Sequence, residues 1–445
     1  MEGILQFLIY FFLSLFGLSG NNGFPESNGG LNGYVIKKEI KTDLDKLEMV
    51  NRFYDSNHHQ LFWFSLDREG FMRRQSLIDL LNNCKYFGLD KNDYHDQDIR
   101  DNLKNLFLPG DSTIAMQNDR VFTDAALHYG IDLFRGTGMA SLINSDEISP
   151  KYITRDENFL VSQLLKEKTS DNLNQYISSL EPTDSCYLLL KSTLKMYIDS
   201  ADIYKVSQLA SSINQYRWIH HNKFNQIIVV NIPSASLKYF VNDSVMLTMK
   251  VVVGRTSNRT PRFAAYTDQL ILFPYWNVPY NIAVKEYLPL FKKTPSMVDV
   301  LKMQILDSKG SIIPAYKVSW SLYSKDYFPL RMRQSTGCDN ALGVLKFNLT
   351  SPYDVYMHDT NFKTAFNSNY RFYSHGCIRL EKPFELADFL LKTPLDRVSC
   401  VDPGLKQSPK SIPLENPVPV FVVYMTAEVS GNQVLFFPDI YKILK

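Results

Sequence analysis

The feature that most constrains this chain is a change of hydrophobic period near residue 224. Upstream, from 42 to about 218, apolar residues recur at three- and four-residue spacing, which is typical of amphipathic helices. One such face carries Leu44, Leu47, Val50 and Tyr54. Downstream, short β-branched and aromatic runs alternate with Pro, Gly, Asn or Asp. The two periods predict an α+β multidomain protein, with an all-helical domain at 42–220 and a mainly-β domain at 224–445.

Capping and turn residues mark the ends of predicted helices and strands in both halves. Asp43 and Asp156 stand where helix N-caps are expected, and Gly88 and Gly136 where helices can end. Asn242-Asp243 between two apolar runs predicts a hairpin turn. The predicted strands are 226–232, 245–253, 269–273, 344–349, 354–357 and 420–425. We expect them to form a sandwich-like or barrel-like sheet.

Strand signals become sparse between 282 and about 335. Residues 284–293 and 296–303 have helical patterns instead. We therefore expect an inserted helical subdomain here, placed as a lid over one end of the sheet.

The N-terminus predicts export. Residues 4–18 are fifteen uncharged, mostly apolar residues followed by small Ser19 and Gly20, as in a secretory signal, although no Lys or Arg precedes them. We expect 1–20 to be either a cleaved signal peptide or a retained anchor, and the Asn- and Gly-rich 21–41 to be a linker. Five cysteines, an odd number, leave at least one thiol unpaired.

Composition excludes several classes of protein. With 48 Lys and Arg against 46 Asp and Glu the formal charge is only +2, so no global basic field favours nucleic acid. Hydrophobic residues make up 45% of the chain and exclude a disordered one.

The strongest chemical signal is the segment 373–380, Tyr-Ser-His-Gly-Cys-Ile-Arg-Leu, preceded by His358 at the end of a predicted strand. A cysteine attacks as the thiolate and needs a neighbouring base to ionise at neutral pH. His358 is a candidate base for Cys377. Gly376 lets the backbone approach a substrate, so the N–H groups of Gly376 and Cys377 are candidate oxyanion donors.

Three simpler interpretations stay open from the residues alone. A buried cysteine is commonly an inert small hydrophobe. His358, Asp359, His375 and Cys377 have side chains that can bind metal, but no CxxC, HxxxH or HExxH spacing supports a metal site. A disulfide at Cys377 is the third interpretation. We expect no metal and no cofactor.

The string Ser374-His375-Gly376-Cys377-Ile378-Arg379, with a histidine upstream, resembles the signature of the L,D-transpeptidase catalytic-domain family, bacterial cell-wall enzymes with a cysteine nucleophile. Further segments recur in the same order in the large, scaffold-bearing branch of that family. They are Val251–Arg255, Pro274–Pro279, Lys285-Glu286, Arg333-Gln334, Gly343–Phe347 and Tyr356–Thr360, with Gly88–Asp90 and Thr123–Ala125 in the helical half.

The resemblance implies a role for each matching residue. Cys377 takes the position of the nucleophile and His358 that of the base. Ser374, His375 and Gly376 fall on the loop that positions the nucleophile, and Arg379 falls near the substrate. The implied reaction joins peptidoglycan stem peptides in the periplasm, with the N-terminal segment as signal or inner-membrane anchor and with other cell-wall synthesis proteins as partners.

Four further residues are candidate substrate contacts. Tyr356 and Asp359 flank the expected base, Trp276 offers a stacking surface, and Arg333 a planar fork for carboxylates. Packing is the alternative for Trp276 and surface solvation for Arg333. Large family members often carry a peptidoglycan-binding module between scaffold and catalytic domain, whereas here only about twenty residues separate the helix near Tyr197 from Trp218.

Overall fold

The computed structural model describes residues 48–65, 67–105, 112–137, 158–169, 173–222, 224–351, 353–395 and 407–444. All of them belong to one of the two compact units of the chain, which spans Lys46–Lys445. The predicted signal segment, the linker, both proposed N-caps and Cys400 lie outside the described residues.

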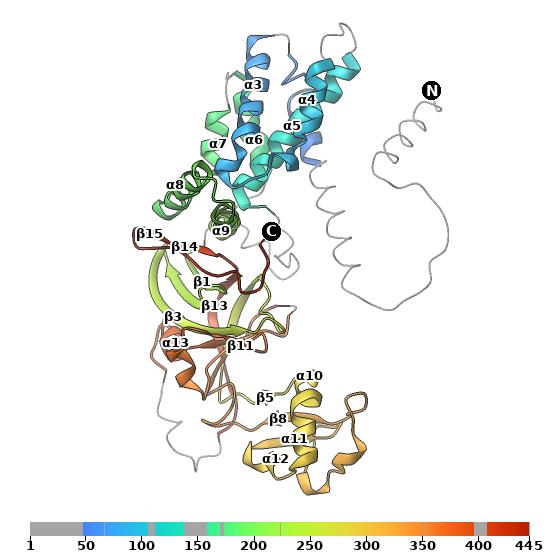
Figure 1. Cartoon of the computed structure of the whole chain (residues 1–445), viewed down its shortest axis with the longest axis vertical. Coiled ribbons are helices and arrows are strands. Elements are labelled where there is room, and N and C mark those ends of the chain that lie inside the picture. Colours follow the sequence, from blue (N-terminus) through green and yellow to red (C-terminus); the bar gives the residue numbers. More distant parts are fainter. Residues whose placement is uncertain are drawn as a thin grey trace, which may run out of the picture. The chain divides into compact units, whose positions relative to one another are not determined.

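The N-terminal half is helical, as the sequence predicts (Figure 1). After a helical stretch at 48–56 come α3 (Arg68–Asn83), α4 (Asp96–Asn105), α5 (Ser112–Arg135), α6 (Asn158–Lys166), α7 (Asn174–Leu180), α8 (Ser185–Asp199) and α9 (Ile203–His221). Three short 3₁₀ turns join them: η1 (Cys84–Phe87), η2 (Lys91–Tyr94) and η5 (Glu167–Thr169). Gly88 and Gly136 have positive φ, +69° and +83°, so both helix-end predictions are confirmed.

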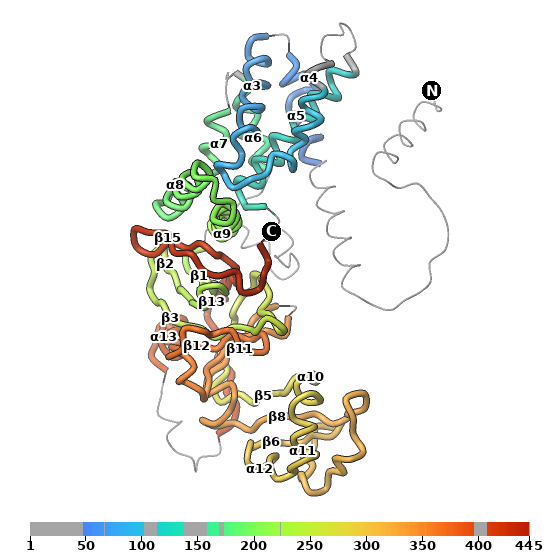
Figure 2. Tube along the Cα trace, in the orientation of Figure 1, coloured from blue at the N-terminus to red at the C-terminus, as the bar shows by residue number. Residues whose placement is uncertain are grey.

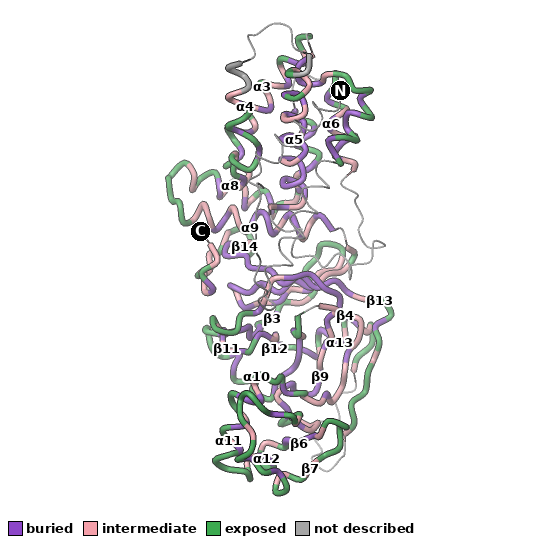
Figure 3. Tube along the Cα trace, turned by 90° about the vertical axis from the view of Figure 1, so that its right-hand side faces the viewer, coloured by how far each residue is buried: buried purple, intermediate pink, exposed green. Residues whose placement is uncertain are grey.

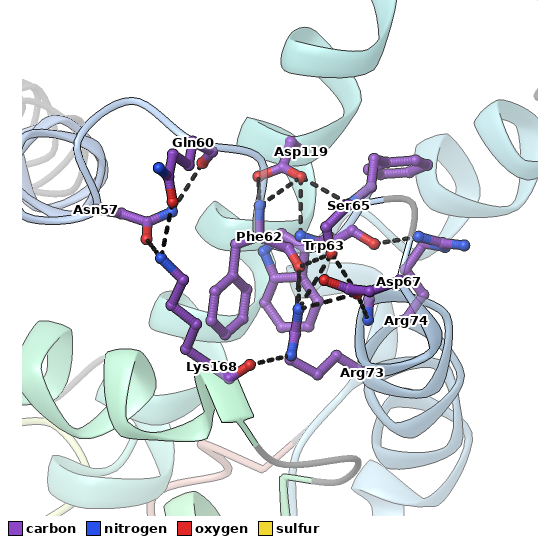
Figure 4. A network of polar contacts seen from close by, with 12 residues as sticks. Asn57, Gln60, Phe62, Trp63, Ser65, Asp67, Arg73, Arg74, Asp119 and Lys168 are labelled. Atoms are coloured by element: carbon purple, nitrogen blue, oxygen red, sulfur yellow. Dashed lines mark hydrogen bonds and ion pairs between the residues drawn. The ribbon is translucent and has the colours of Figure 1, made fainter.

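A buried carboxylate organises the helical half (Figure 4). Asp119 on α5 accepts hydrogen bonds from the backbone N–H groups of Phe62, Trp63 and Phe64 at 2.8–3.1 Å, and from the Tyr54 hydroxyl at 2.5 Å. These donors replace water around a side chain that is 0% exposed. The carboxylate therefore fixes the loop after the first helical stretch against α5.

The C-terminal half is built on a nine-stranded sheet in the order β11-β3-β12-β10-β9-β4-β13-β1-β2. Its strands are β1 (Gln226–Asn231), β2 (Ser236–Val241), β3 (Ser244–Gly254), β4 (Phe263–Leu272), β9 (Leu345–Phe347), β10 (Met357–His358), β11 (Phe372–Ser374), β12 (Ile378–Leu380) and β13 (Lys410–Val423). Residues 244–250 of β3 pair with β2, Val251 and Val252 pair with β12, and Val253 and Gly254 pair with β11, so the sheet closes on itself through β3 (Figure 2). The fold is therefore barrel-like rather than two separate packed sheets. The hairpin turn at Asn242-Asp243, which joins β2 to β3, is confirmed.

The two faces of the sheet have different neighbours. Inward residues such as Val251, Phe347 and Met357 form the main core, which α13 (Pro383–Leu391) completes with Leu386 and Leu390. At one end the outer face packs against Trp218 of α9 through Val229, Phe421 and Val423. The roughly twenty residues before Trp218 are thus mostly helix, and they join the helical half to the sheet.

The insert is a small domain with its own core (Figure 3). The prediction that it is helical was incomplete, because it also holds a four-stranded sheet in the order β5-β8-β6-β7. These strands are β5 (Trp276–Asn277), β6 (Met303–Leu306), β7 (Ile312–Ile313) and β8 (Arg331–Gln334). Around them lie α10 (Tyr280–Ile282), the π-helical turn η6 (Ala283–Tyr287), α11 (Leu288–Lys293) and α12 (Met297–Val300), with 3₁₀ turns at Ala315–Lys317 and Trp320–Leu322. Strands of two to four residues are too short to show a period in the sequence.

A β-hairpin, β14 (Ala427–Ser430) and β15 (Gln433–Phe436), packs on α8 and α9 and leads into the C-terminal tail. Among the described residues, no helix combines the length and apolar character that crossing a membrane requires.

Candidate active site

Strand pairing places five functional side chains on one outer face of the sheet. The strands β10 and β12 are parallel, with Met357 beside Ile378 and His358 beside Arg379. Because side chains alternate along a strand, Tyr356 and His358 share a face with Cys377 and Arg379, while Met357 and Ile378 point into the core. On the other side of β10, Lys346 of β9 lies opposite His358 and joins the same face. We call these five residues the catalytic face: Lys346, Tyr356, His358, Cys377 and Arg379.

Cys377 is half-buried just before β12 and forms no disulfide. Its Sγ donates to the Asp354 carbonyl at 3.7 Å and is hydrogen-bonded to the main chain and hydroxyl of Tyr356. Burial raises the pKa of the thiol. The Tyr356 hydrogen bonds and the positive charges of Lys346 and Arg379 favour the thiolate and lower that pKa. The surroundings thus oppose ionisation by burial and support it by charge.

His358 is buried and held in one tautomer. Its Nδ1 lies against the main-chain carbonyl of Asp359, which can only accept a hydrogen bond, so Nδ1 carries the proton and Nε2 is the free base. Burial and the nearby cations Arg379 and Lys346 lower the pKa of His358 to about 3. The imidazole is therefore neutral at physiological pH, with Nε2 unprotonated, although burial and the two cations weaken it as a base. Diagonal neighbours on paired strands, as His358 and Cys377 are, come within reach of one another's side chains.

Ser374 shapes the loop before the cysteine. Its hydroxyl donates to the Cys377 carbonyl at 2.6 Å and accepts from the Gly376 N–H at 3.1 Å. Gly376 has φ +120°, a conformation that favours glycine. Since its N–H is engaged by Ser374, Gly376 does not offer the oxyanion donor that the sequence suggested. The Cys377 N–H, which has no acceptor among the residues that the structure describes, is the candidate that is left.

The C-terminal tail is connected to this loop by hydrogen bonds. The Tyr441 hydroxyl donates to the Gly254 carbonyl at 2.5 Å and accepts from the Thr260 N–H at 3.2 Å. Thr260 Oγ1 in turn donates to the Gly376 carbonyl at 2.8 Å. A chain of hydrogen bonds therefore runs from the penultimate turn of the protein to the residue before Cys377.

The insert touches the site in two places. Glu286 of the π-helical turn is hydrogen-bonded to His375 (2.7 Å, Nε2 to Oε1) and lies 3.5 Å from the guanidinium of Arg255. The Trp276 side chain, at the start of the insert, lies near enough to Tyr356 to lower the pKa of its hydroxyl, against the larger effect of burial, which raises it. Both contacts connect the insert to residues next to Cys377, as the lid interpretation requires.

Two residues that the sequence analysis names as candidate substrate contacts, Asp359 and Arg333, contact other residues of the chain. The Asp359 carboxylate is buried, accepts from the Val344 N–H at 3.0 Å and pairs with Lys363. Arg333 donates to Gln304 at 2.7 Å, and its guanidinium lies 4.1 Å from the centre of the Tyr275 ring. Asp359 thus holds the turn at Val344, and Arg333 belongs to the sheet of the insert.

Three residues near the site were missed from the sequence: Lys346, Glu286 and Tyr441. Lys346 and Glu286 lie within segments that carried the resemblance, but only strand register and the fold of the insert show which way they face. Tyr441 had no sequence signal. Among the described residues, no three His, Cys, Asp or Glu side chains come together as a metal site.

Comparison with known proteins finds similar domains in both halves of the chain. Residues 225–407 match the family model of the L,D-transpeptidase catalytic domain, and residues 48–194 match that of the scaffold domain. A Haemophilus influenzae protein, named provisionally as an L,D-transpeptidase, is 32% identical over 289 residues. The match covers 64% of this chain and 58% of that relative.

Solved structures of L,D-transpeptidases match more distantly. An enzyme from Mycobacterium smegmatis is 14% identical with a TM-score of 0.21, over 45% of this chain and 58% of that one. The catalytic domain from Enterococcus faecium, acylated by ertapenem, is 11% identical with a TM-score of 0.24, over 45% and 98%. The family models carry the assignment. Residues 225–407 are an L,D-transpeptidase catalytic domain, joined to a scaffold domain at residues 48–194.

Proposed function

We propose that this protein is an exported L,D-transpeptidase that forms 3-3 cross-links between peptidoglycan stem peptides. The observation that carries the proposal is the shared face of β10 and β12, where a thiol and a neutral imidazole lie on neighbouring strands inside the matched domain. The site of action is the periplasm, with residues 1–20 as signal or anchor and with other cell-wall synthesis proteins as partners.

In the first half-reaction His358 Nε2 accepts the proton of Cys377. The thiolate adds to the carbonyl of the third stem residue, and the Cys377 N–H stabilises the oxyanion. The C–N bond to the terminal D-Ala then breaks, and the D-Ala amine leaves with the proton from His358. A thioester between Cys377 and the stem peptide is left.

In the second half-reaction a side-chain amine of another stem peptide attacks the thioester. His358 takes the proton of the amine, the C–S bond breaks, and His358 then returns that proton to the Cys377 thiolate. Water in place of the amine makes the reaction a carboxypeptidase step. The Glu286–His375 and Trp276–Tyr356 contacts favour transfer, because a docked insert shields the thioester from water.

Product analysis separates these outcomes. The full-length chain is incubated with a disaccharide tetrapeptide, and the products are resolved by chromatography and weighed by mass spectrometry. A dimer that lacks one D-Ala supports transpeptidation. Tripeptide alone would make the protein a carboxypeptidase or a cysteine hydrolase, and an unchanged substrate would favour a non-enzymatic wall-binding scaffold protein.

The lid interpretation has its own test. Glu286→Gln removes the charge that faces His375 and Arg255 but keeps the side-chain shape. We expect a higher ratio of tripeptide to dimer in the variant. An unchanged ratio would show that the insert does not exclude water through this contact.

A further inference from the structure

Two cations of the catalytic face have no carboxylate partner among the described residues. Neither Lys346 nor Arg379 forms an ion pair with any Asp or Glu that the structure describes. Burial lowers the pKa of both side chains, and the groups that oppose this shift are the Cys377 thiol and, for Arg379, the Tyr373 hydroxyl, neither of which is a carboxylate. A half-buried positive charge without a carboxylate partner lowers the stability of the fold. Two such charges on the catalytic face are therefore expected to serve a function.

Lys346 is placed beside the reacting groups. It lies opposite His358 on the neighbouring strand, and its Nζ is 4.2 Å from the centre of the Tyr356 ring. A ring face attracts a cation but leaves the three N–H donors of the ammonium without acceptors. The same ammonium interacts electrostatically with Cys377.

Arg379 stands on the other side of His358, in register with it on β12. Its guanidinium lies 6.0 Å from the centre of the Tyr373 ring and interacts electrostatically with Cys377. Arg371 differs in this respect, because it donates to the carbonyls of Val251, Ser234 and Ala235. Arg379 therefore keeps a planar fork available for a bidentate anion.

The two cations thus flank the base on β9 and β12, and both interact with the nucleophile. An anion that satisfies them must lie next to the carbonyl that Cys377 attacks. In the donor of the proposed reaction, the carboxylate of the leaving D-Ala is three covalent bonds from that carbonyl. No other carboxylate of the leaving residue exists, and a further residue at the C-terminus would carry the negative charge away.

We propose that Lys346 and Arg379 form a subsite for the terminal carboxylate of the donor peptide and so select donors that end one residue after the scissile bond. The inference rests on the proposed function and adds to it the group that is recognised. It also assigns Lys346 a role in specificity.

The test compares two donors on the full-length protein: a disaccharide tetrapeptide with a free C-terminal carboxylate, and the same compound as its C-terminal amide. The wild-type protein is expected to favour the free acid in kcat/KM by about 10- to 100-fold, the value of a charge-assisted contact. Lys346→Met and Arg379→Gln should each reduce this ratio, and the double variant should bring it close to one. Lys325→Met, at a lysine that is 78% exposed, is the matched control and should keep the wild-type ratio.

The ratio isolates recognition from reactivity, because a change in the Cys377 thiolate slows both donors equally. Alkylation of Cys377 by iodoacetamide, a neutral reagent, measures that reactivity separately. If Lys346→Met slows both donors by the same factor, the lysine only tunes the thiol and the subsite is refuted. A donor amidated on the side-chain carboxylate of its third residue should react like the parent; a loss confined to that donor would assign the cations to the third residue instead.

The same experiment distinguishes failure of the carboxylate subsite from failure of the proposed function. A wild-type protein that is acylated equally well by acid and amide contradicts the subsite and leaves transpeptidation standing. A wild-type protein that is acylated by neither donor contradicts the proposed function, and the subsite with it.

Discussion

Asp119 in the scaffold domain and Lys346 on the catalytic face are both charged side chains removed from bulk water, but their surroundings differ. The Asp119 carboxylate accepts from three backbone N–H groups and a tyrosine hydroxyl. The Lys346 ammonium has a tyrosine ring and, among the described residues, no anion. The first charge is satisfied by the chain itself, whereas the second is not.

The difference separates structural from functional use of charge. A buried carboxylate with a full set of donors holds segments together, and its removal leaves those donors without partners. An unsatisfied cation weakens the fold and is useful only when a ligand completes it. The catalytic face also contains a buried imidazole, His358, that is neutral at physiological pH.

The largest expected effect comes from His358 as the base. His358→Gln keeps the size of the side chain but removes proton transfer, and we expect acylation of Cys377 to slow by about 10²- to 10⁴-fold. Rapid-quench mass spectrometry of the acyl-enzyme measures the rate. His59→Gln, at an exposed histidine, is the control. A rate within threefold of wild type would mean that another group takes the proton.

His358 also links pH to stability. Its pKa of about 3 in the folded state lies below its ordinary value of about 6.5, so between these values the unfolded chain binds a proton that the folded chain does not. Stability should therefore fall as pH falls through this window, by up to about 1.4 kcal/mol per pH unit from this residue. Urea unfolding at several pH values should show a shallower fall for His358→Gln. An equal slope in both proteins would place the proton on the folded imidazole.

Asp119→Ala tests whether the buried carboxylate stabilises the scaffold domain. Loss of the carboxylate leaves the N–H groups of the loop at Phe62–Phe64 without acceptors, and we expect a loss of about 3 kcal/mol in unfolding free energy. Chemical denaturation measures it. A loss below about 1 kcal/mol would show that water replaces the carboxylate easily.

Tyr441→Phe tests whether the tail positions the nucleophile loop. The variant loses the hydroxyl that bonds Gly254 and Thr260, so we expect about a tenfold lower kcat with KM unchanged and about 1 kcal/mol less stability. Steady-state kinetics and thermal unfolding give the two readouts. A change in KM with kcat intact would instead connect the tail to substrate binding.

The smallest effect, in the opposite direction, is expected for the stability of Lys346→Met. Since the ammonium has no anion to lose, the unfolding free energy should stay the same or rise by up to about 1 kcal/mol. The same denaturation assay as for Asp119→Ala measures it. A loss comparable to that of Asp119→Ala would mean that Lys346 is a structural residue and would remove the contrast between the two regions.

The sequence predicted the parts of this fold that depend on local pattern. The helical half, the strands at 226–231 and 244–254 and their Asn242-Asp243 turn follow from period and turn chemistry. The short strands β11 and β12 and the sheet of the insert do not, because two- to four-residue strands are stabilised by distant partners. The strand predicted at 354–357 begins only at Met357, since its pairing with β9 starts there.

The candidate site likewise contains residues that the sequence predicts and residues that only the fold identifies. Cys377, His358 and their loop follow from residue type and spacing in one short stretch of sequence. Lys346 reads as an ordinary outward lysine in an alternating strand, and only its register with His358 places it at the site. Asp359 had a suitable side chain and position, but its contacts with Val344 and Lys363 lie away from the catalytic face. The sequence shows which side chains are capable of the chemistry, whereas only the fold shows which way each side chain points.

Intact-protein mass spectrometry of the full-length chain with a disaccharide tetrapeptide tests whether Cys377 is the nucleophile. The account predicts a covalent adduct that equals the donor minus D-Ala, mapped to Cys377, and a second adduct at the same residue with a carbapenem, whose strained lactam offers a carbonyl to the thiolate. Cys377→Ala should keep the wild-type melting temperature and form neither adduct. An adduct on another residue, or none in the folded wild-type protein, would contradict the assignment of Cys377 as the nucleophile.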